Sequence, residues 1–176
     1  MARQIALLRG INLGAHNRVP MPRLRELLGE LGYEDVETVV QSGNIVLSSS
    51  LKAADLEKTL QQQIAAEFDV DTPVVVRTPA QLAKVVSENP LPDAVAAPKL
   101  FQVSFCTAKI GAAVARELES ADLGDEQVAV RGREVYAFHA NGIQKSPLVK
   151  LLTDKKLGVT ATARNWNTVT KLLELA

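Results

Sequence analysis

Residues 36–47 read VETVVQSGNIVL, and this stretch decides the fold that the sequence predicts. Two short apolar runs, 36–41 and 44–47, are separated by Ser42 and Gly43. A serine and a glycine between two such runs are typical of the tight turn of a β-hairpin, because glycine readily adopts the positive φ that the turn requires. The sequence therefore predicts a pair of antiparallel strands here.

The flanking residues place this hairpin inside a longer pattern. Residues 3–9 are an apolar run that predicts a strand, and leucines then recur at helical spacing over 24–31, ahead of Gly32, which is suited to ending a helix. After the hairpin, apolar residues recur every four positions over 56–68, and residues 73–77 are mostly β-branched. The order strand, helix, hairpin, helix, strand is βαββαβ.

A second pattern of the same kind follows a proline-rich segment. Pro90, Pro92 and Pro98 predict a linker over 90–98, between one subdomain over 1–89 and another over 99–176. The second subdomain repeats the order of elements, which are predicted as strand 100–106, helix 110–118, strands 127–130 and 134–138, and helices beginning near 147 and within 160–166. We expect an α+β fold made of two similar ferredoxin-like subdomains, each a mostly antiparallel sheet covered by helices.

Composition excludes several classes of protein. The chain has 176 residues, 47% hydrophobic and 23% charged, which is ordinary for a globular protein and excludes a disordered chain. Its longest apolar run near the amino terminus, residues 5–8, is too short for a signal peptide, and no run is long enough to cross a membrane. The single cysteine, Cys106, cannot form an internal disulfide and is predicted to be a buried thiol. We expect a cytoplasmic protein with no membrane contact.

Three blocks of residues resemble one known family. They are residues 7–14 with Asn17 and Met21, then residues 41–44, and finally residues 136–142 with Ser146 and 162–168. Together they are similar to the bacterial family called domain of unknown function 1697. The resemblance implies a ferredoxin-like first half and a related second half, and it implies no established activity and no catalytic residue.

The formal net charge is zero, but the charges are unevenly distributed. Residues 1–25 contain five arginines and no acid, and residues 131–176 contain eight basic and three acidic side chains. The middle, residues 26–130, contains seven basic and seventeen acidic side chains. The zero total argues against a chain that coats nucleic acid through bulk charge, yet it permits a local anion site at either basic end.

The loop over residues 9–18 is one candidate for such a site. Its backbone amides and its two cations could hold a phosphate or carboxylate, although turn chemistry alone also explains its glycines and asparagines. The residues of the neighbouring hairpin turn either present neutral hydrogen-bonding groups to a ligand or serve only to form the turn. The candidate ligand-binding residues of these two segments are Arg9, Asn12, Asn17, Arg18, Gln41, Ser42 and Asn44.

The basic carboxyl-terminal segment supplies the other candidates, Lys145, Arg164 and Asn165. Threonines ahead of Arg164 are predicted to cap a helix that bears this cation in its first turn, which is unfavourable for the helix dipole unless an anion binds there. The alternative is that Trp166 packs in the core and that Arg164 pairs with a carboxylate. The sequence leaves both interpretations open.

No cofactor or metal motif is present. The glycine spacing disfavours a dinucleotide fingerprint, and the lack of a Gly-Lys-Ser/Thr motif disfavours a P-loop. The two histidines have no cysteine or acidic cluster beside them. We expect no cofactor and no metal site.

The leading hypothesis is a protein that binds an anionic, phosphate-bearing molecule such as a nucleotide or RNA at a basic site made by the first loop and the start of the last helix. One alternative is an enzyme of phosphoester or group-transfer chemistry in the same pocket, with Tyr136, His139 or Ser42 moving the proton. The other is a protein-interaction module whose acidic middle, including Glu117 and Glu119, faces a basic partner. The sequence settles neither catalysis nor oligomeric state.

Overall fold

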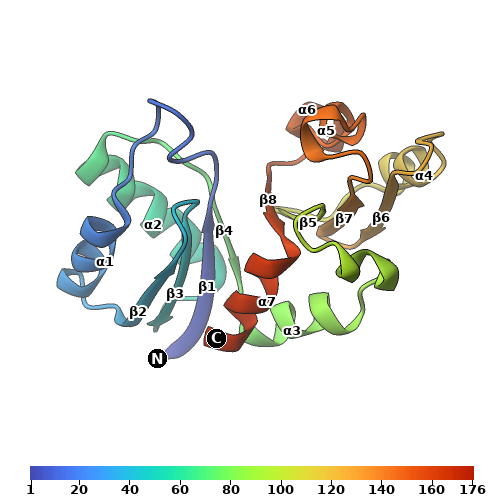
Figure 1. Cartoon of the computed structure of the whole chain (residues 1–176). Helices are drawn as coiled ribbons and strands as arrows, with labels where there is room; N and C mark the ends of the chain where they lie inside the picture. The colour runs from blue at the N-terminus through green and yellow to red at the C-terminus, as the bar shows by residue number, and fades with distance from the viewer. The chain divides into compact units, whose positions relative to one another are not determined.

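The computed structural model describes all residues, 1–176 (Figure 1). The chain divides into two compact units. Unit 1 comprises Met1–Ala83 and Lys171–Ala176, and unit 2 comprises Lys84–Thr170. Residues 90–98, predicted as a linker, include a short 3-10 helix, η1 (Pro92–Ala96), while the division between the units falls within the preceding helix, α3 (Pro79–Ser87).

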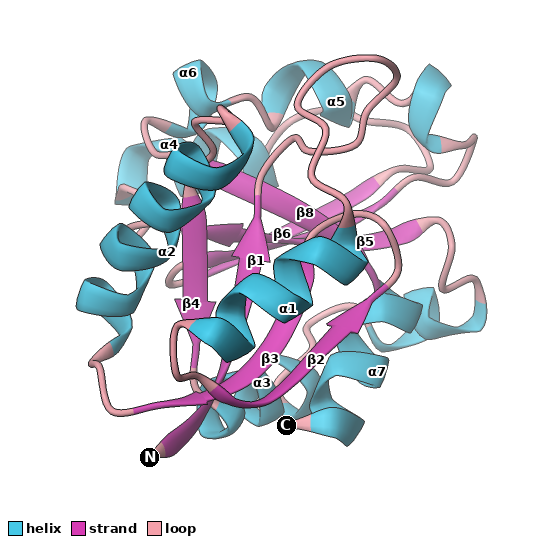
Figure 2. Cartoon of the chain, turned by 90° about the vertical axis from the view of Figure 1, so that its left-hand side faces the viewer, coloured by secondary structure: helices cyan, strands magenta, loops and turns pink.

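Unit 1 contains a four-stranded sheet in the order β2-β3-β1-β4, and all neighbouring strands are antiparallel. The strands are β1 (Ala2–Leu8), β2 (Glu34–Val39), β3 (Asn44–Ser49) and β4 (Val74–Arg77). Helices α1 (Met21–Glu30) and α2 (Ala53–Phe68) connect them in the predicted βαββαβ order, and Figure 2 shows α1 lying across the sheet.

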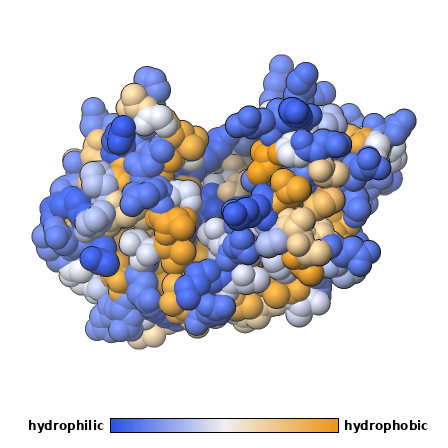
Figure 3. All heavy atoms as spheres, in the orientation of Figure 1, coloured by the Kyte–Doolittle hydropathy of each residue, from blue (hydrophilic) through white to orange (hydrophobic).

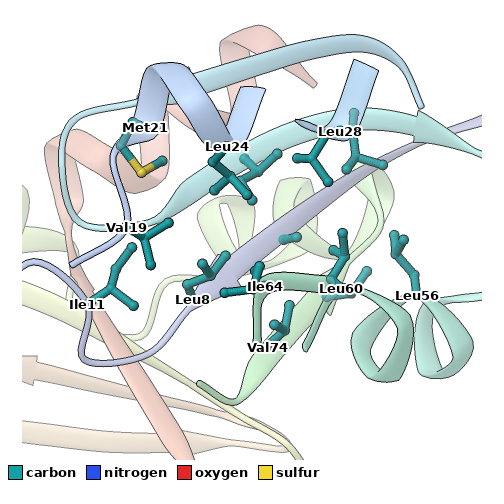
Figure 4. Packing of buried hydrophobic residues seen from close by; sticks show 14 of the residues in the cluster. Leu8, Ile11, Val19, Met21, Leu24, Leu28, Leu56, Leu60, Ile64 and Val74 are labelled. Carbon is teal, nitrogen blue, oxygen red and sulfur yellow. The ribbon is translucent and has the colours of Figure 1, made fainter. Parts of the chain in front are cut away.

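The core of unit 1 lies between the sheet and these two helices (Figure 4). Leu8 of β1 and Val74 of β4 face Leu24 of α1 and Leu60 of α2, and all four are at most 4% exposed. Helical spacing of leucines on α1 and period-two alternation on the strands bring these side chains to one layer. The pattern that predicted the elements therefore also identifies the core.

Unit 2 contains a second four-stranded antiparallel sheet in the order β6-β7-β5-β8. Its strands are β5 (Phe101–Cys106), β6 (Gln127–Arg131), β7 (Glu134–Phe138) and β8 (Ala161–Asn165). Its helices are α4 (Ala112–Glu119), the 3-10 helix η2 (Ile143–Lys145), α5 (Leu148–Leu151), α6 (Asp154–Leu157) and α7 (Trp166–Leu175), whose last residues belong to unit 1. The strand order repeats that of unit 1, so the α+β fold with two similar subdomains is confirmed, as is the buried thiol of Cys106.

Carboxylates cover outward-facing amides of three edge strands. Val76 N of β4 donates to Glu57 Oε1 at 2.8 Å, and Val130 N of β6 donates to Glu119 Oε1 at 2.8 Å. Ala161 N of β8 donates to Asp154 Oδ1 at 3.2 Å. An edge amide that is already bonded is a poorer template for another strand, so these acids oppose edge-to-edge association.

Hydrophilic residues cover much of the face of each unit seen in Figure 3, with smaller apolar areas between them. No helix combines the length and the hydropathy needed to cross a bilayer.

Candidate functional site

Seven of the ten predicted ligand-binding residues lie in unit 1, on the loop that joins β1 to α1 and on the turn that joins β2 to β3. We call residues 9–20 the β1–α1 loop. Leu8 N donates to Gly43 O at 2.8 Å, and Asn12 Nδ2 donates to Gln41 O at 2.8 Å. These bonds bring the loop and the turn to the same end of the sheet.

Asn12 holds the β1–α1 loop in shape. Its Oδ1 accepts a hydrogen bond from Val19 N at 2.9 Å, and its Nδ2 donates to Val19 O at 2.9 Å as well as to Gln41 O. Its φ of 55° lies in the left-handed region, which asparagine tolerates better than most residues. The side chain is therefore occupied by backbone groups and acts as a brace.

We expect Asn12→Ala to lower the free energy of unfolding by about 2 kcal/mol, because three hydrogen bonds are lost and alanine resists the positive φ. Urea denaturation followed by circular dichroism measures the loss. Asn17→Ala is the matched control, since Asn17 has a similar φ of 50° but makes one side-chain bond, to Gly10 O at 3.1 Å. Equal losses in the two variants would rule out the bracing role.

The turn between β2 and β3 also uses its predicted ligand-binding groups internally. Asn44 is fully buried, and its Nδ2 donates to Val39 O at 3.0 Å and to Ser42 Oγ at 3.0 Å. Gly43 has a φ of +80° and packs directly against Leu8. The turn interpretation of this segment therefore accounts for Asn44, while Gln41 and Ser42 remain exposed.

The arginines of the basic amino-terminal segment differ in their surroundings. Arg3 pairs with Glu37 and also donates to Leu175 O, and Arg23 donates to Glu30 Oε1 at 3.0 Å and Glu67 Oε1 at 2.8 Å. The hydrogen bonds that Arg23 donates to both glutamates raise its pKa. These two arginines serve the structure, whereas Arg18 on the β1–α1 loop and Arg25 on α1 are exposed.

On the exposed part of that loop, Leu13 and His16 form an isolated antiparallel bridge around Gly14 and Ala15. Arg18 follows, exposed and without an ion pair, and Arg9 lies half-buried at the base of the loop. Cross-strand partners project to one side, so Leu13, which is 68% exposed, and His16 lie next to each other. Neither residue was selected from the sequence, because only the structure shows that the Leu13 side chain is exposed.

The predicted site residues of unit 2 do not form the expected helix start. The prediction that Arg164 lies in the first turn of a helix is wrong: Ala161–Asn165 is strand β8, and α7 begins at Trp166. Arg164 is 6% exposed, and its Nη1 donates to Thr162 Oγ1 at 2.6 Å and to Ala163 O at 2.8 Å. Burial lowers the pKa of Arg164 to about 10.

Trp166 follows the alternative interpretation, and Asn165, predicted as a ligand-binding residue, caps the last helix. Asn165 Oδ1 accepts from Thr168 N at 3.0 Å, which makes Asn165 the amino-terminal cap of α7. Trp166 is 8% exposed and stacks on Phe101 with ring centroids 4.8 Å apart, so it is a core residue. Lys145, at the end of η2, is exposed.

Two of the three proton-transfer groups of the enzyme hypothesis, Tyr136 and His139, are enclosed, whereas Ser42 is exposed. Tyr136 is 2% exposed, its hydroxyl donates to Val85 O at 2.8 Å, and burial raises its pKa. His139 is 1% exposed, and burial lowers its pKa. Neither ring can reach a ligand at the surface of unit 2.

Three further features bear on the other predictions. The Glu119 carboxylate accepts hydrogen bonds from Val130 N and Arg131 Nη1, so it stabilises β6. Glu117, the other acid of the interaction hypothesis, is exposed. No group of three or more metal-ligating side chains is present. A groove of unit 1 lined by residues 1–4, 49–53 and 78–80 contains none of the predicted site residues.

Comparison with solved structures finds the same fold in a bacterial protein. A conserved protein from Streptococcus pneumoniae aligns with a TM-score of 0.77 at 24% sequence identity, covering 98% of this chain and 97% of that one. At this identity the likeness concerns the fold alone. No curated protein matches the chain.

The family comparison matches the first two of the three blocks of residues described above. A model of the family described as protein of unknown function (DUF1697) matches residues 1–136, so of the third block only Tyr136 lies inside the match. The matched range covers all of the sheet of unit 1 and most of the sheet of unit 2. The chain therefore belongs to the family of proteins of unknown function DUF1697.

Proposed function

We propose that unit 1 binds a phosphate-bearing molecule, a nucleotide or an RNA strand, on its β1–α1 loop. The observation that supports this most directly is Arg18: it is exposed, forms no ion pair, and lies two residues from the exposed His16 on a loop braced by Asn12. Residues 1–25 contain five arginines and no acid. A guanidinium is suited to a phosphate because it donates two parallel hydrogen bonds.

The proposal differs from the sequence-based hypothesis in its residues. Arg164 is enclosed in unit 2 and Asn44 is enclosed in unit 1, and each bonds to neighbouring groups of its own unit. Asn12 and Asn17 shape the loop through backbone groups. Arg9, His16 and Arg18 are the cationic or titratable groups of the loop, and Gln41 and Ser42 on the adjacent turn are the exposed neutral donors.

Equilibrium binding tests this directly. Fluorescence anisotropy with a labelled single-stranded RNA of about 12 nucleotides and with labelled ATP, at salt concentrations from about 50 to 300 mM, measures affinity and its salt dependence. We expect Arg18→Gln to weaken binding about three- to tenfold and to reduce the slope of log K against log salt by about one, the value for one lost phosphate contact.

Arg116→Gln is the matched control, since Arg116 is an exposed arginine on α4 of unit 2. It is expected to leave affinity for both probes unchanged. Binding of RNA alone or of ATP alone identifies the ligand class. An absence of binding to both probes at the lowest salt, or an equal loss in the two variants, would refute the proposal.

A further inference from the structure

Unit 2 encloses a group of three polar side chains that the proposed function does not use. Glu126 precedes β6, His139 follows β7, and Ser146 follows η2; these residues are 6%, 1% and 5% exposed. Buried polar groups are costly unless they are hydrogen-bonded, so this cluster needs a structural or functional reason.

Glu126 holds the segment from Asn141 to Leu148. Ser146 Oγ donates to Glu126 Oε2 at 2.8 Å and accepts from Leu148 N, the first residue of α5, at 3.2 Å. Asn141 N donates to Glu126 Oε1 at 3.4 Å. One carboxylate thus fixes the turn after β7 and the start of α5.

His139 lies beside this carboxylate without bonding to it. Its backbone is paired, because His139 N donates to Leu100 O and His139 O accepts from Gly142 N, both at 2.9 Å. Neither imidazole nitrogen has a hydrogen-bond partner, and Nδ1 is 3.9 Å from Glu126 Oε2. Glu126 is the charged group that acts electrostatically on the ring.

Protonation of His139 changes which hydrogen bonds this cluster can form. The imidazolium carries two N–H donors and a charge, and a charge-assisted N–H to carboxylate bond requires about 2.8 Å. Oε2 is the nearby acceptor, and it already receives the Ser146 hydroxyl. A shift of about 1 Å that closes the His139–Glu126 pair therefore competes with the Ser146 bond.

We propose that protonation of His139 draws Glu126 Oε2 away from Ser146 and so loosens residues 140–152, the segment that carries the exposed Lys145 and Lys150. The proton comes from solvent and returns to it, so the change is a reversible response to acidity. It acts on a basic segment of unit 2, whereas the β1–α1 loop belongs to unit 1.

The direction of the pH dependence follows from burial. Burial lowers the pKa of His139 in the folded chain, whereas an unfolded chain has a histidine pKa of about 6.5. The unfolded or opened state therefore binds the proton more readily, and the stability that this residue contributes is present above about pH 6.5 and is lost as the pH falls below it.

Amide hydrogen exchange of the full chain at about pH 7.5 and 5.5 tests the proposal, with protection factors corrected for intrinsic exchange. We expect protection over 140–152 to fall about tenfold at the lower pH relative to β5 and β7. His139→Gln, which does not titrate, should abolish this difference, and His139→Asn serves if the first variant does not fold. Ser146→Ala should leave the segment weakly protected at both values.

NMR titration of the unmodified chain follows the His139 ring directly, and its signals should shift at a pKa below the ordinary histidine value. A pH-dependent loss of protection that persists in His139→Gln, or its absence in the unmodified chain, would overturn the proposal.

Discussion

Replacing Gly43 by alanine is expected to lower the free energy of unfolding by about 3 kcal/mol. Gly43 has a φ of +80°, and an added Cβ would lie 2.7 Å from Leu8 Cβ and 2.9 Å from Ile11 Cδ1. Leu8 cannot withdraw, since it is fully buried in the central strand β1 and its N–H donates to Gly43 O at 2.8 Å. The energetic costs of backbone strain and of steric overlap with Leu8 therefore add in the Gly43→Ala variant.

Gly14→Ala separates the two contributions. Gly14 has a φ of +62°, but no atom lies within 4 Å of the place that an added Cβ would take, so only the backbone strain of about 1 kcal/mol applies. Urea denaturation of both variants gives the difference, which measures the close approach of the hairpin turn to β1. If Gly14→Ala is as damaging as Gly43→Ala, the overlap with Leu8 has no energetic role.

The hairpin illustrates why the first sheet could be predicted from the sequence. Its strand β3 is buried on both faces and contains an apolar run, and its turn contains a glycine where positive φ is required. The capping box of α3 is a local signal of the same kind: Thr78 N donates to Gln81 Oε1 at 2.9 Å and Gln81 N donates to Thr78 Oγ1 at 3.2 Å. Local signals of this kind act within a few residues.

Strand β8 was missed because its pattern is inverted. Thr162 and Arg164 are 4% and 6% exposed, whereas the apolar Ala163 between them is exposed. Period-two alternation is present, but with polar residues inside, and threonines before a helix also suit a cap. Pairing with β5, where Val103 opposes Arg164, decides the conformation, and that pairing joins distant parts of the chain.

The last strands of the two sheets also share a buried arginine that is followed by a helix cap, a likeness that the sequence alone did not reveal. Arg77 ends β4 and is followed by the cap Thr78, and Arg164 in β8 is followed by the cap Asn165. Both arginines are buried, at 1% and 6% exposure. The equivalence depends on strand order, because Arg77 opposes β1 as Arg164 opposes β5.

The candidate site shows a similar limit. Asparagines were predicted from the sequence to bind a ligand. In the structure, however, the side-chain amide of Asn12 already donates to Gln41 O, which belongs to another loop. The cluster of Glu126, His139 and Ser146 likewise forms only when β6 and β7 pair. Side-chain type was readable from the sequence, and availability to a ligand was not.

The largest loss of stability in unit 2 is expected for Trp166→Ala, at about 3 to 5 kcal/mol. Trp166 stacks on Phe101 with the ring planes 24° apart, and Phe101 stacks in turn on Tyr136 at a centroid distance of 6.4 Å. Truncation removes a large buried surface and one member of this aromatic series, and it leaves a cavity at the start of α7.

Thermal unfolding followed by far-ultraviolet circular dichroism measures the effect, since the variant lacks the single tryptophan of the chain. A loss of this size corresponds to a fall in Tm of about 10 °C in a chain of this length. Trp166→Phe should retain most of the stacking and lose far less. Val149→Ala, at a site 48% exposed on α5, should change Tm by about 1 to 2 °C at most. A fall for Trp166→Ala no greater than that of Val149→Ala would mean that the aromatic series does not stabilise unit 2, and Trp166 would then be free to serve a ligand.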